Sequence, residues 1–127
     1  MTTGALILLL LIAIVTIANG ANDVSKGVAT LAGSGVARAR RAILWGTVCT
    51  VAGGLAAIAW GGALAGSFGS SLVAPGFRVD QTFLTATLLG ASLWLLFATR
   101  LGLPVSTTHA LLGGLVGAVL ASAGPDG

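Results

Sequence analysis

Two polar stretches interrupt an otherwise apolar chain, and both carry side chains that can bind ions. Residues 19–26 read NGANDVSK, and residues 104–110 read PVSTTHA. The first stretch contains a carboxylate and an ammonium group, whereas the second contains three consecutive hydroxyls and a histidine. These residue types suit a cation site and an anion site, respectively.

Asp23 is the residue in the first stretch that most needs a partner. A carboxylate at membrane depth is unfavourable unless it is paired, protonated or bound to a cation. Lys26 follows three residues later, on the same face of a helix, so one interpretation is a local ion pair. In the other, Asp23 and the amide oxygen of Asn22 bind Na⁺, or Asp23 takes up a proton. Both interpretations stay open at this point.

The second stretch has the pattern of a helix start. Pro104 ends the element before it, and Ser106 is a residue type that caps helices. The first turn then holds Thr107, Thr108 and His109. Unpaired N–H groups, the positive end of the helix dipole and three hydroxyls together form a candidate anion site. An ordinary cap is the alternative for the serine, and for His109 a hydrogen-bonded helix histidine is favoured over a proton relay.

The composition places these stretches in an all-α integral membrane protein. Hydrophobic residues make up 56% of the 127 residues, charged residues make up 7%, and the mean hydropathy is +1.05. Four apolar stretches are each long enough, or nearly so, to cross about 30 Å of hydrocarbon as helices. We therefore expect a single transmembrane domain over residues 1–127. The six basic residues lie mostly between apolar stretches, so we interpret them as topology signals and expect no nucleic-acid partner.

The first apolar stretch is long for one simple span. As a single helix, residues 4–35 would measure about 48 Å at 1.5 Å per residue, against about 30 Å of hydrocarbon. We expect a broken or re-entrant helix near residues 19–23 and a second interruption at residues 104–109. Non-helical backbone persists in the membrane only where protein or a water-filled cavity satisfies it, so each break should line a site.

The basic residues also predict the orientation. Arg38, Arg40 and Arg41 follow the first apolar stretch, and Arg100 follows the third. If each stretch crosses once, all four lie on one side, which should be the cytoplasmic side. The chain would then be a multi-pass protein of the cell membrane with its N-terminus outside. Arg78 falls on the outer side in this scheme, against the rule.

The two polar stretches together suggest transport and not catalysis. An anion beside Asp23 is repelled unless a cation or proton neutralises the carboxylate, so the binding of the two ions would be coupled. Interrupted helices that meet near the membrane midplane are typical of secondary transporters. An enzyme is disfavoured because Ser106 and His109 lie beside no orienting carboxylate and no oxyanion motif.

The strings NGANDVSKGVATLAGSG and TRLGLPVSTTHALLGGLVGA resemble the two signature stretches of one repeat of the inorganic phosphate transporter family. The resemblance covers nearly the whole chain. It implies cation-coupled symport of phosphate by two inverted repeats, of which this chain would be the N-terminal half. It also implies that Asn22 and Asp23 lie in the substrate and cation site. The anion would contact the hydroxyls of Ser106, Thr107 and Thr108.

Two departures from the family pattern bear on these implications. Many members read GANDVAN, whereas this chain has Ser25 and Lys26 at the last two positions. An ammonium there could replace a coupling cation or attract the anion. Lys26 is therefore a candidate modulator, as is His109, and the coupling ion stays open between Na⁺ and H⁺. The chain also contains one repeat, so the second would lie in the same longer chain, in a separate half or in an oligomeric copy.

Other functions remain as alternatives. The family includes members that resemble sulfate permeases, and sulfate and phosphate are both tetrahedral anions. A small oligomeric anion channel could use the same hydroxyl-rich helix start, whereas a structural membrane subunit would need neither polar stretch. No cofactor is expected beyond the coupling ion, for which Asp23 would be the ligand if that ion is Na⁺.

Overall fold

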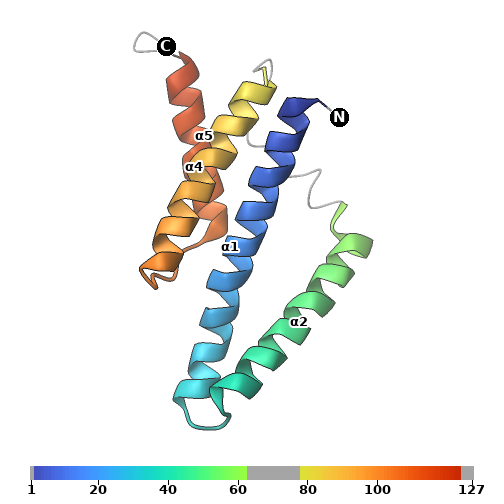
Figure 1. Cartoon of the computed structure of the whole chain (residues 1–127), viewed down its shortest axis with the longest axis vertical. Helices are drawn as coiled ribbons and strands as arrows, with labels where there is room; N and C mark the ends of the chain where they lie inside the picture. Colours follow the sequence, from blue (N-terminus) through green and yellow to red (C-terminus); the bar gives the residue numbers. More distant parts are fainter. Residues whose placement is uncertain (1, 63–77, 124–127) are drawn as a thin grey trace. The chain divides into compact units, whose positions relative to one another are not determined.

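The computed structural model of the chain describes residues 2–62 and 78–123, most of which are helical (Figure 1). No strand is found in these two ranges, so the all-α prediction is confirmed. The sequence also predicts a Gly-, Ser- and Pro-rich loop at residues 67–81. Residues 63–77 and 124–127 lie outside the described residues. The helices are α1 (Thr3–Gly33), α2 (Ala39–Trp60), α4 (Gln81–Arg100) and α5 (Thr107–Ala123).

Three of these helices, α1, α2 and α4, are long and apolar enough to cross a membrane, and α5 is apolar but shorter. Many of the large hydrophobic side chains point outward; Leu10 is 61% exposed and Ile58 is 82% exposed. Such extensive apolar exposure is unfavourable in water but is what a lipid-facing helix requires. The protein is an all-α membrane protein.

The break predicted near residues 19–23 is wrong. α1 runs without interruption from Thr3 to Gly33. Its 31 residues correspond to about 46 Å, and a helix longer than the hydrocarbon core can tilt or extend into the headgroup region. Excess length therefore does not require a break. The asparagine side chains bond to groups outside α1 and leave its backbone hydrogen bonds in place.

The chain divides into two compact units. The first comprises Met1–Asp23 and Val79–Gly127, and the second comprises Val24–Arg78. In the second unit, α2 approaches α1 at Gly46, where a Cβ would lie 2.8 Å from the Val28 Cγ1 atom. In the first unit, α1, α4 and α5 share a small hydrophobic core made of Val15, Ala18, Ala91, Leu95 and Ala110.

α4 and α5 lie side by side and touch through their backbones (Figure 1). A Cβ on Gly114 would lie 2.4 Å from the carbonyl oxygen of Thr87. A Cβ on Gly90 would lie 3.6 Å from the Cα atom of Gly114. Glycine at these positions therefore permits the close approach that stabilises helix pairs in membranes.

The linker between α4 and α5 confirms the second predicted interruption. Gly102 has a φ of 69°, in the left-handed region that favours glycine. Its N–H donates to the Thr99 carbonyl at 3.1 Å, and the N–H of Leu103 donates to the Ala98 carbonyl at 2.9 Å. This pair of bonds is typical of a helix that ends at glycine. Pro104 follows, so the glycine ends the helix and the proline lies in the linker.

Candidate functional site

Ser106 caps α5. Its Oγ accepts a hydrogen bond from the backbone N–H of His109 at 3.3 Å and lies 2.9 Å from Nδ1 of the same histidine. Since Oγ already accepts the backbone proton, the serine can donate its own proton to Nδ1 when the imidazole carries its proton on Nε2. The prediction that Ser106 is an N-cap residue and that His109 falls in the first turn is confirmed.

Asn22 joins α1 to the linker that precedes α5. Its side chain is 4% exposed. Its Nδ2 donates to the carbonyl of Leu103 at 2.9 Å, and its Oδ1 accepts from the N–H of Val105 at 3.2 Å. The two bonded groups flank Pro104, which has no N–H of its own. One asparagine amide thus holds the linker on both sides of its proline.

Asn19 makes a second link between α1 and the start of α5. The hydroxyl of Thr107 donates to Oδ1 of Asn19. Asn19 precedes Asn22 by three residues, and residues at this spacing share one face of a helix. One face of α1 therefore holds both the linker and the first residue of α5.

The remaining predicted site residues lie at exposed positions. Asp23 follows Asn22 on α1, in the same compact unit as α5, and its side chain is exposed. Thr108 is also exposed, in the first turn of α5. Lys26 is exposed and belongs to the second compact unit. The structure thus brings Asn22 to the start of α5. There the Ser106 hydroxyl contacts His109, the Thr107 hydroxyl donates to Asn19, and Thr108 is exposed.

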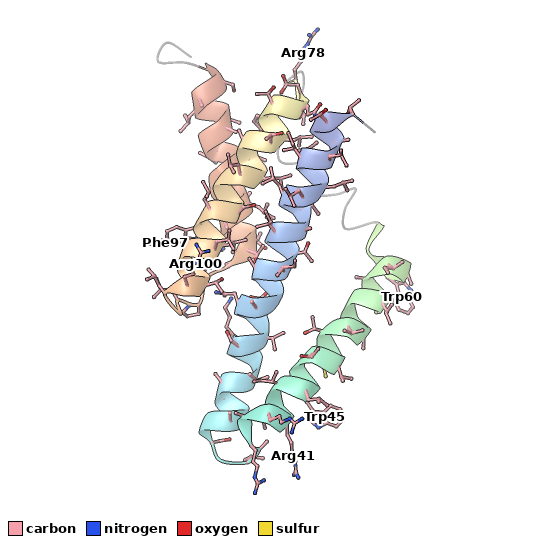
Figure 2. The ribbon with its side chains drawn as sticks, in the orientation of Figure 1. Arg41, Trp45, Trp60, Arg78, Phe97 and Arg100 are labelled. Carbon is pink, nitrogen blue, oxygen red and sulfur yellow. The ribbon has the colours of Figure 1, made fainter. Side chains whose placement is uncertain are left out.

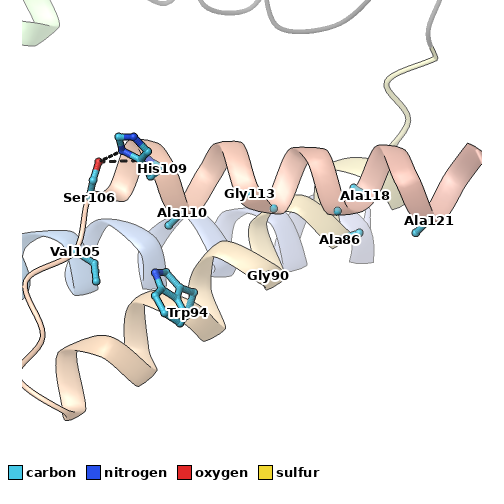
Figure 3. A pocket seen from close by; sticks show the side chains of 12 residues that line it. Ala86, Gly90, Trp94, Val105, Ser106, His109, Ala110, Gly113, Ala118 and Ala121 are labelled. Carbon is cyan, nitrogen blue, oxygen red and sulfur yellow. Dashed lines mark hydrogen bonds between the residues drawn. The ribbon is translucent and has the colours of Figure 1, made fainter.

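A groove of about 850 Å³ runs between α4 and α5. Figure 3 shows Ser106 and His109 near one end of this groove and Ala121 toward the other. Trp94 also lines it, from α4. The polar end offers the first turn of a helix as a donor to an anion, together with either the Ser106 hydroxyl or the His109 imidazole, depending on which ring nitrogen carries the proton. The rest is lined by small residues, which include Ala86, Gly90, Gly113, Gly117 and Ala118.

The sequence was compared with models of protein families. The model described as the phosphate transporter family matches residues 19–127. The chain belongs to the phosphate transporter family. The matched segment begins at Asn19 and includes both polar stretches, and the family resemblance noted in the sequence is confirmed.

Individual relatives carry the name "Putative phosphate permease". The relative from Helicobacter pylori strain J99 is 39% identical over 109 residues, which cover 83% of this chain and 20% of the relative. The relative from Chlamydia muridarum is 41% identical over 103 residues, which cover 77% of this chain and 24% of the relative. The chain therefore spans a fifth to a quarter of the length of these family members. No solved structure matches the chain.

In residues 2–62 and 78–123, no group of three or more His, Cys, Asp or Glu side chains comes together.

Sequence reasoning missed three contributors to the site. It did not predict Asn19 as the partner of Thr107, nor the backbone groups of Leu103 and Val105 as partners of Asn22. The spacing of the two asparagines was a usable signal, because a continuous helix puts both on one face. Because a break in this helix was expected at residues 19–23, the two asparagines were not assigned to one face. No sequence signal marks which backbone groups an amide will bind.

Proposed function

We propose that this chain is one repeat of a transporter that couples the uptake of inorganic phosphate across the cell membrane to a cation. The observation that carries the proposal is the family match over residues 19–127, which includes both polar stretches. The name that the relatives carry, "Putative phosphate permease", supports phosphate as the substrate. The activity belongs to a transporter and not to an enzyme.

In this proposal the anion binds at the start of α5. The hydroxyls of Ser106 and Thr108 contact the anion, as does that of Thr107 once it gives up its bond to Asn19. The positive end of the α5 dipole stabilises the negative charge. Asn22 belongs to the same site, and His109 modulates it through its contact with Ser106. The groove between α4 and α5 supports this location, because its polar end is the Ser106 end.

Asp23 supplies the coupling in this proposal. Its carboxylate repels phosphate until Na⁺ or H⁺ neutralises it, so the anion and the cation bind together. Asn22 provides an oxygen for the same cation, and Lys26 is a candidate modulator of the coupling. A second repeat, from the same longer chain, a separate half or another copy, completes the site. The N-terminus faces outside and the loop with Arg38, Arg40 and Arg41 faces the cytoplasm.

The test is radiolabelled phosphate uptake into proteoliposomes that contain the chain with its second repeat. Na⁺ or H⁺ gradients are imposed separately, and unlabelled sulfate is the competitor. The expected result is accumulation against the phosphate gradient, driven by one of the two cations. Asp23→Asn abolishes this accumulation because the carboxylate can no longer bind the cation or proton. Asp80→Asn is the matched control, since Asp80 caps α4 through its Oδ1 and asparagine caps helices equally well.

The outcomes that contradict the proposal point to the alternatives. Downhill flux that no gradient drives would identify an anion channel. Sulfate accumulation without phosphate accumulation would identify a sulfate permease. A folded complex that moves neither anion, with Asp23→Asn and Asp80→Asn behaving alike, would leave a structural subunit.

A further inference from the structure

The start of α2 carries a concentration of positive charge that its own compact unit does not balance. Arg38, Arg40 and Arg41 lie within four residues, and all three side chains are exposed. The segment Val24–Arg78 contains no Asp or Glu. Within the part of the chain that the structure describes, none of the three guanidinium groups forms an ion pair or side-chain hydrogen bond. An anionic partner for these arginines would therefore have to come from outside this unit.

The N-terminus of α2 adds to this positive potential. Arg38 is the N-cap residue, and its side chain makes no capping hydrogen bond. The first N–H groups of a helix carry the positive end of its dipole, which normally attracts an acidic or hydroxyl cap. Here three arginine side chains occupy the positions at which an anionic group would be favourable.

These arginines line a surface hollow of about 380 Å³ together with Leu44 and Trp45. A second hollow of about 460 Å³ follows along α2 and is lined by Arg40, Ile43, Leu44, Thr47 and Val48. Arg40 and Leu44 line both hollows, so the two meet there. We call the two together the α2 groove.

The second half of the α2 groove is apolar. The Thr47 hydroxyl donates to the Ile43 carbonyl at 2.9 Å, which satisfies it within the helix. Arg40, Leu44 and Val48 follow one another at intervals of four, so they form a stripe along one face. From the first to the last of them the helix rises about 12 Å. The groove thus has a basic end and an apolar end.

The position of the groove along α2 fits the boundary of a membrane. α2 is a candidate span that begins at Ala39, and a span that begins there would place the arginines near the depth of lipid phosphates. Figure 2 shows Arg41 and Trp45 near the start of α2, one turn apart. Tryptophan is enriched at this interface, where its ring contacts both headgroups and the first part of the acyl chains.

We propose that the α2 groove binds one anionic phospholipid. The guanidinium groups of Arg38, Arg40 and Arg41 hold the phosphate, for which their planar donors are well suited. One acyl chain lies along Leu44, Thr47 and Val48. An inorganic anion would use only the basic end, whereas a phospholipid uses both ends. The site is separate from the start of α5 and does not depend on the transport proposed there.

The experiment measures lipid binding to the purified full chain in detergent by native mass spectrometry. The probes are dioleoyl phosphatidylglycerol, dioleoyl phosphatidylcholine and inorganic phosphate. We expect one phosphatidylglycerol to bind in preference to phosphatidylcholine. Arg40→Gln weakens this binding about fivefold, which is the contribution of one arginine near an anionic headgroup. Arg100→Gln is the matched control because it removes an equally exposed charge at the end of α4 and leaves binding unchanged.

A second variant tests the apolar end independently. Val48→Gln leaves all three arginines in place, and we expect it to weaken phosphatidylglycerol binding as well. Circular dichroism checks that each variant keeps the wild-type helix content. The proposal is overturned if phosphatidylcholine binds as tightly as phosphatidylglycerol, if inorganic phosphate displaces the lipid, or if Arg100→Gln weakens binding as much as Arg40→Gln.

Discussion

Asn22 shows how a polar side chain can be held in an apolar helix without opening that helix. Both ends of its amide bond to the backbone of the α4–α5 linker, one on each side of Pro104. Asn19 holds Thr107 from the same face of α1. The start of α5, where we place the anion, is therefore positioned by side chains that come from another helix.

At this scale we predict that Asn22→Ala lowers the free energy of unfolding by about 2–4 kcal/mol, because the Leu103 carbonyl and the Val105 N–H both lose a partner. The measurement is unfolding by sodium dodecyl sulfate in mixed micelles, followed by circular dichroism. Ser34→Ala is the control: this exposed hydroxyl bonds only locally, to the Leu31 carbonyl, and its removal should change the stability by less than about 0.5 kcal/mol. Equal stability of Asn22→Ala and wild type would refute this role.

At the scale of elements, a few residues decide where helices end and how closely they pack. Gly102 ends α4, Asp80 begins it by accepting from the N–H of Phe83, and Gly114 lets α5 rest against α4. The groove beside the Ser106 cap exists because small residues line this helix pair. The shape of the candidate site thus depends on the glycines between α4 and α5 as much as on the polar residues at the start of α5.

Gly114→Ala should destabilise the protein by about 1–3 kcal/mol, because the new methyl would lie 2.4 Å from the Thr87 carbonyl oxygen and force the helices apart. Gly113→Ala is the neighbouring control, since a Cβ there meets nothing within 4 Å. It should be neutral, or stabilising by up to about 1 kcal/mol through helix propensity. The same unfolding titration measures both. A result in which the two variants lose equal stability would contradict a backbone contact at Gly114.

The cap of α4 gives a third expected outcome. Asp80→Ala removes the acceptor for the Phe83 N–H, which lies 2.8 Å away, and should cost about 1 kcal/mol of stability. Asp80→Asn retains the acceptor and should match wild type. If the alanine and asparagine variants were equally stable, the cap would contribute nothing measurable.

The sequence predicted the positions of the helices well, but it did not predict which groups on other helices and linkers their polar side chains bond to. The uninterrupted apolar stretches at residues 42–66 and 82–99 predict two helices that correspond to α2 and α4, and the Pro104–Ser106 pattern predicts the start of α5. The break in α1 was wrong because the length argument treats the membrane as a slab that a helix cannot exceed. The partners of Asn22 lie more than 80 residues away along the chain, and local patterns carry no information on such pairs.

At the scale of the whole molecule, the chain is a membrane unit with much of its apolar surface uncovered. Ile17 is 72% exposed and Leu120 is 67% exposed. The chain spans 20% of the Helicobacter pylori relative and 24% of the Chlamydia muridarum relative. In the transporter that we propose, lipid and a second repeat together cover this surface.

The proposed orientation can be tested with single cysteines in a Cys49→Ala background, because Cys49 is a free, exposed thiol. Val36→Cys lies before the arginines of α2 and is 78% exposed as valine. We expect a membrane-impermeant maleimide to label it only after the cells are permeabilised. Thr2→Cys is the matching position at the N-terminus and should be labelled in intact cells. The reverse pattern would place the arginine loop outside.

The link between Asn22 and Val105 also constrains biosynthesis. The two residues are 83 positions apart, so at about 5–20 residues per second the ribosome needs about 4–17 s between them. α1 enters the membrane long before its hydrogen-bonding partners in the linker exist. The nascent protein must hold α1, with the polar amide of Asn22 in it, until residues 103–105 have been translated, and only then can the α4–α5 hairpin dock against it.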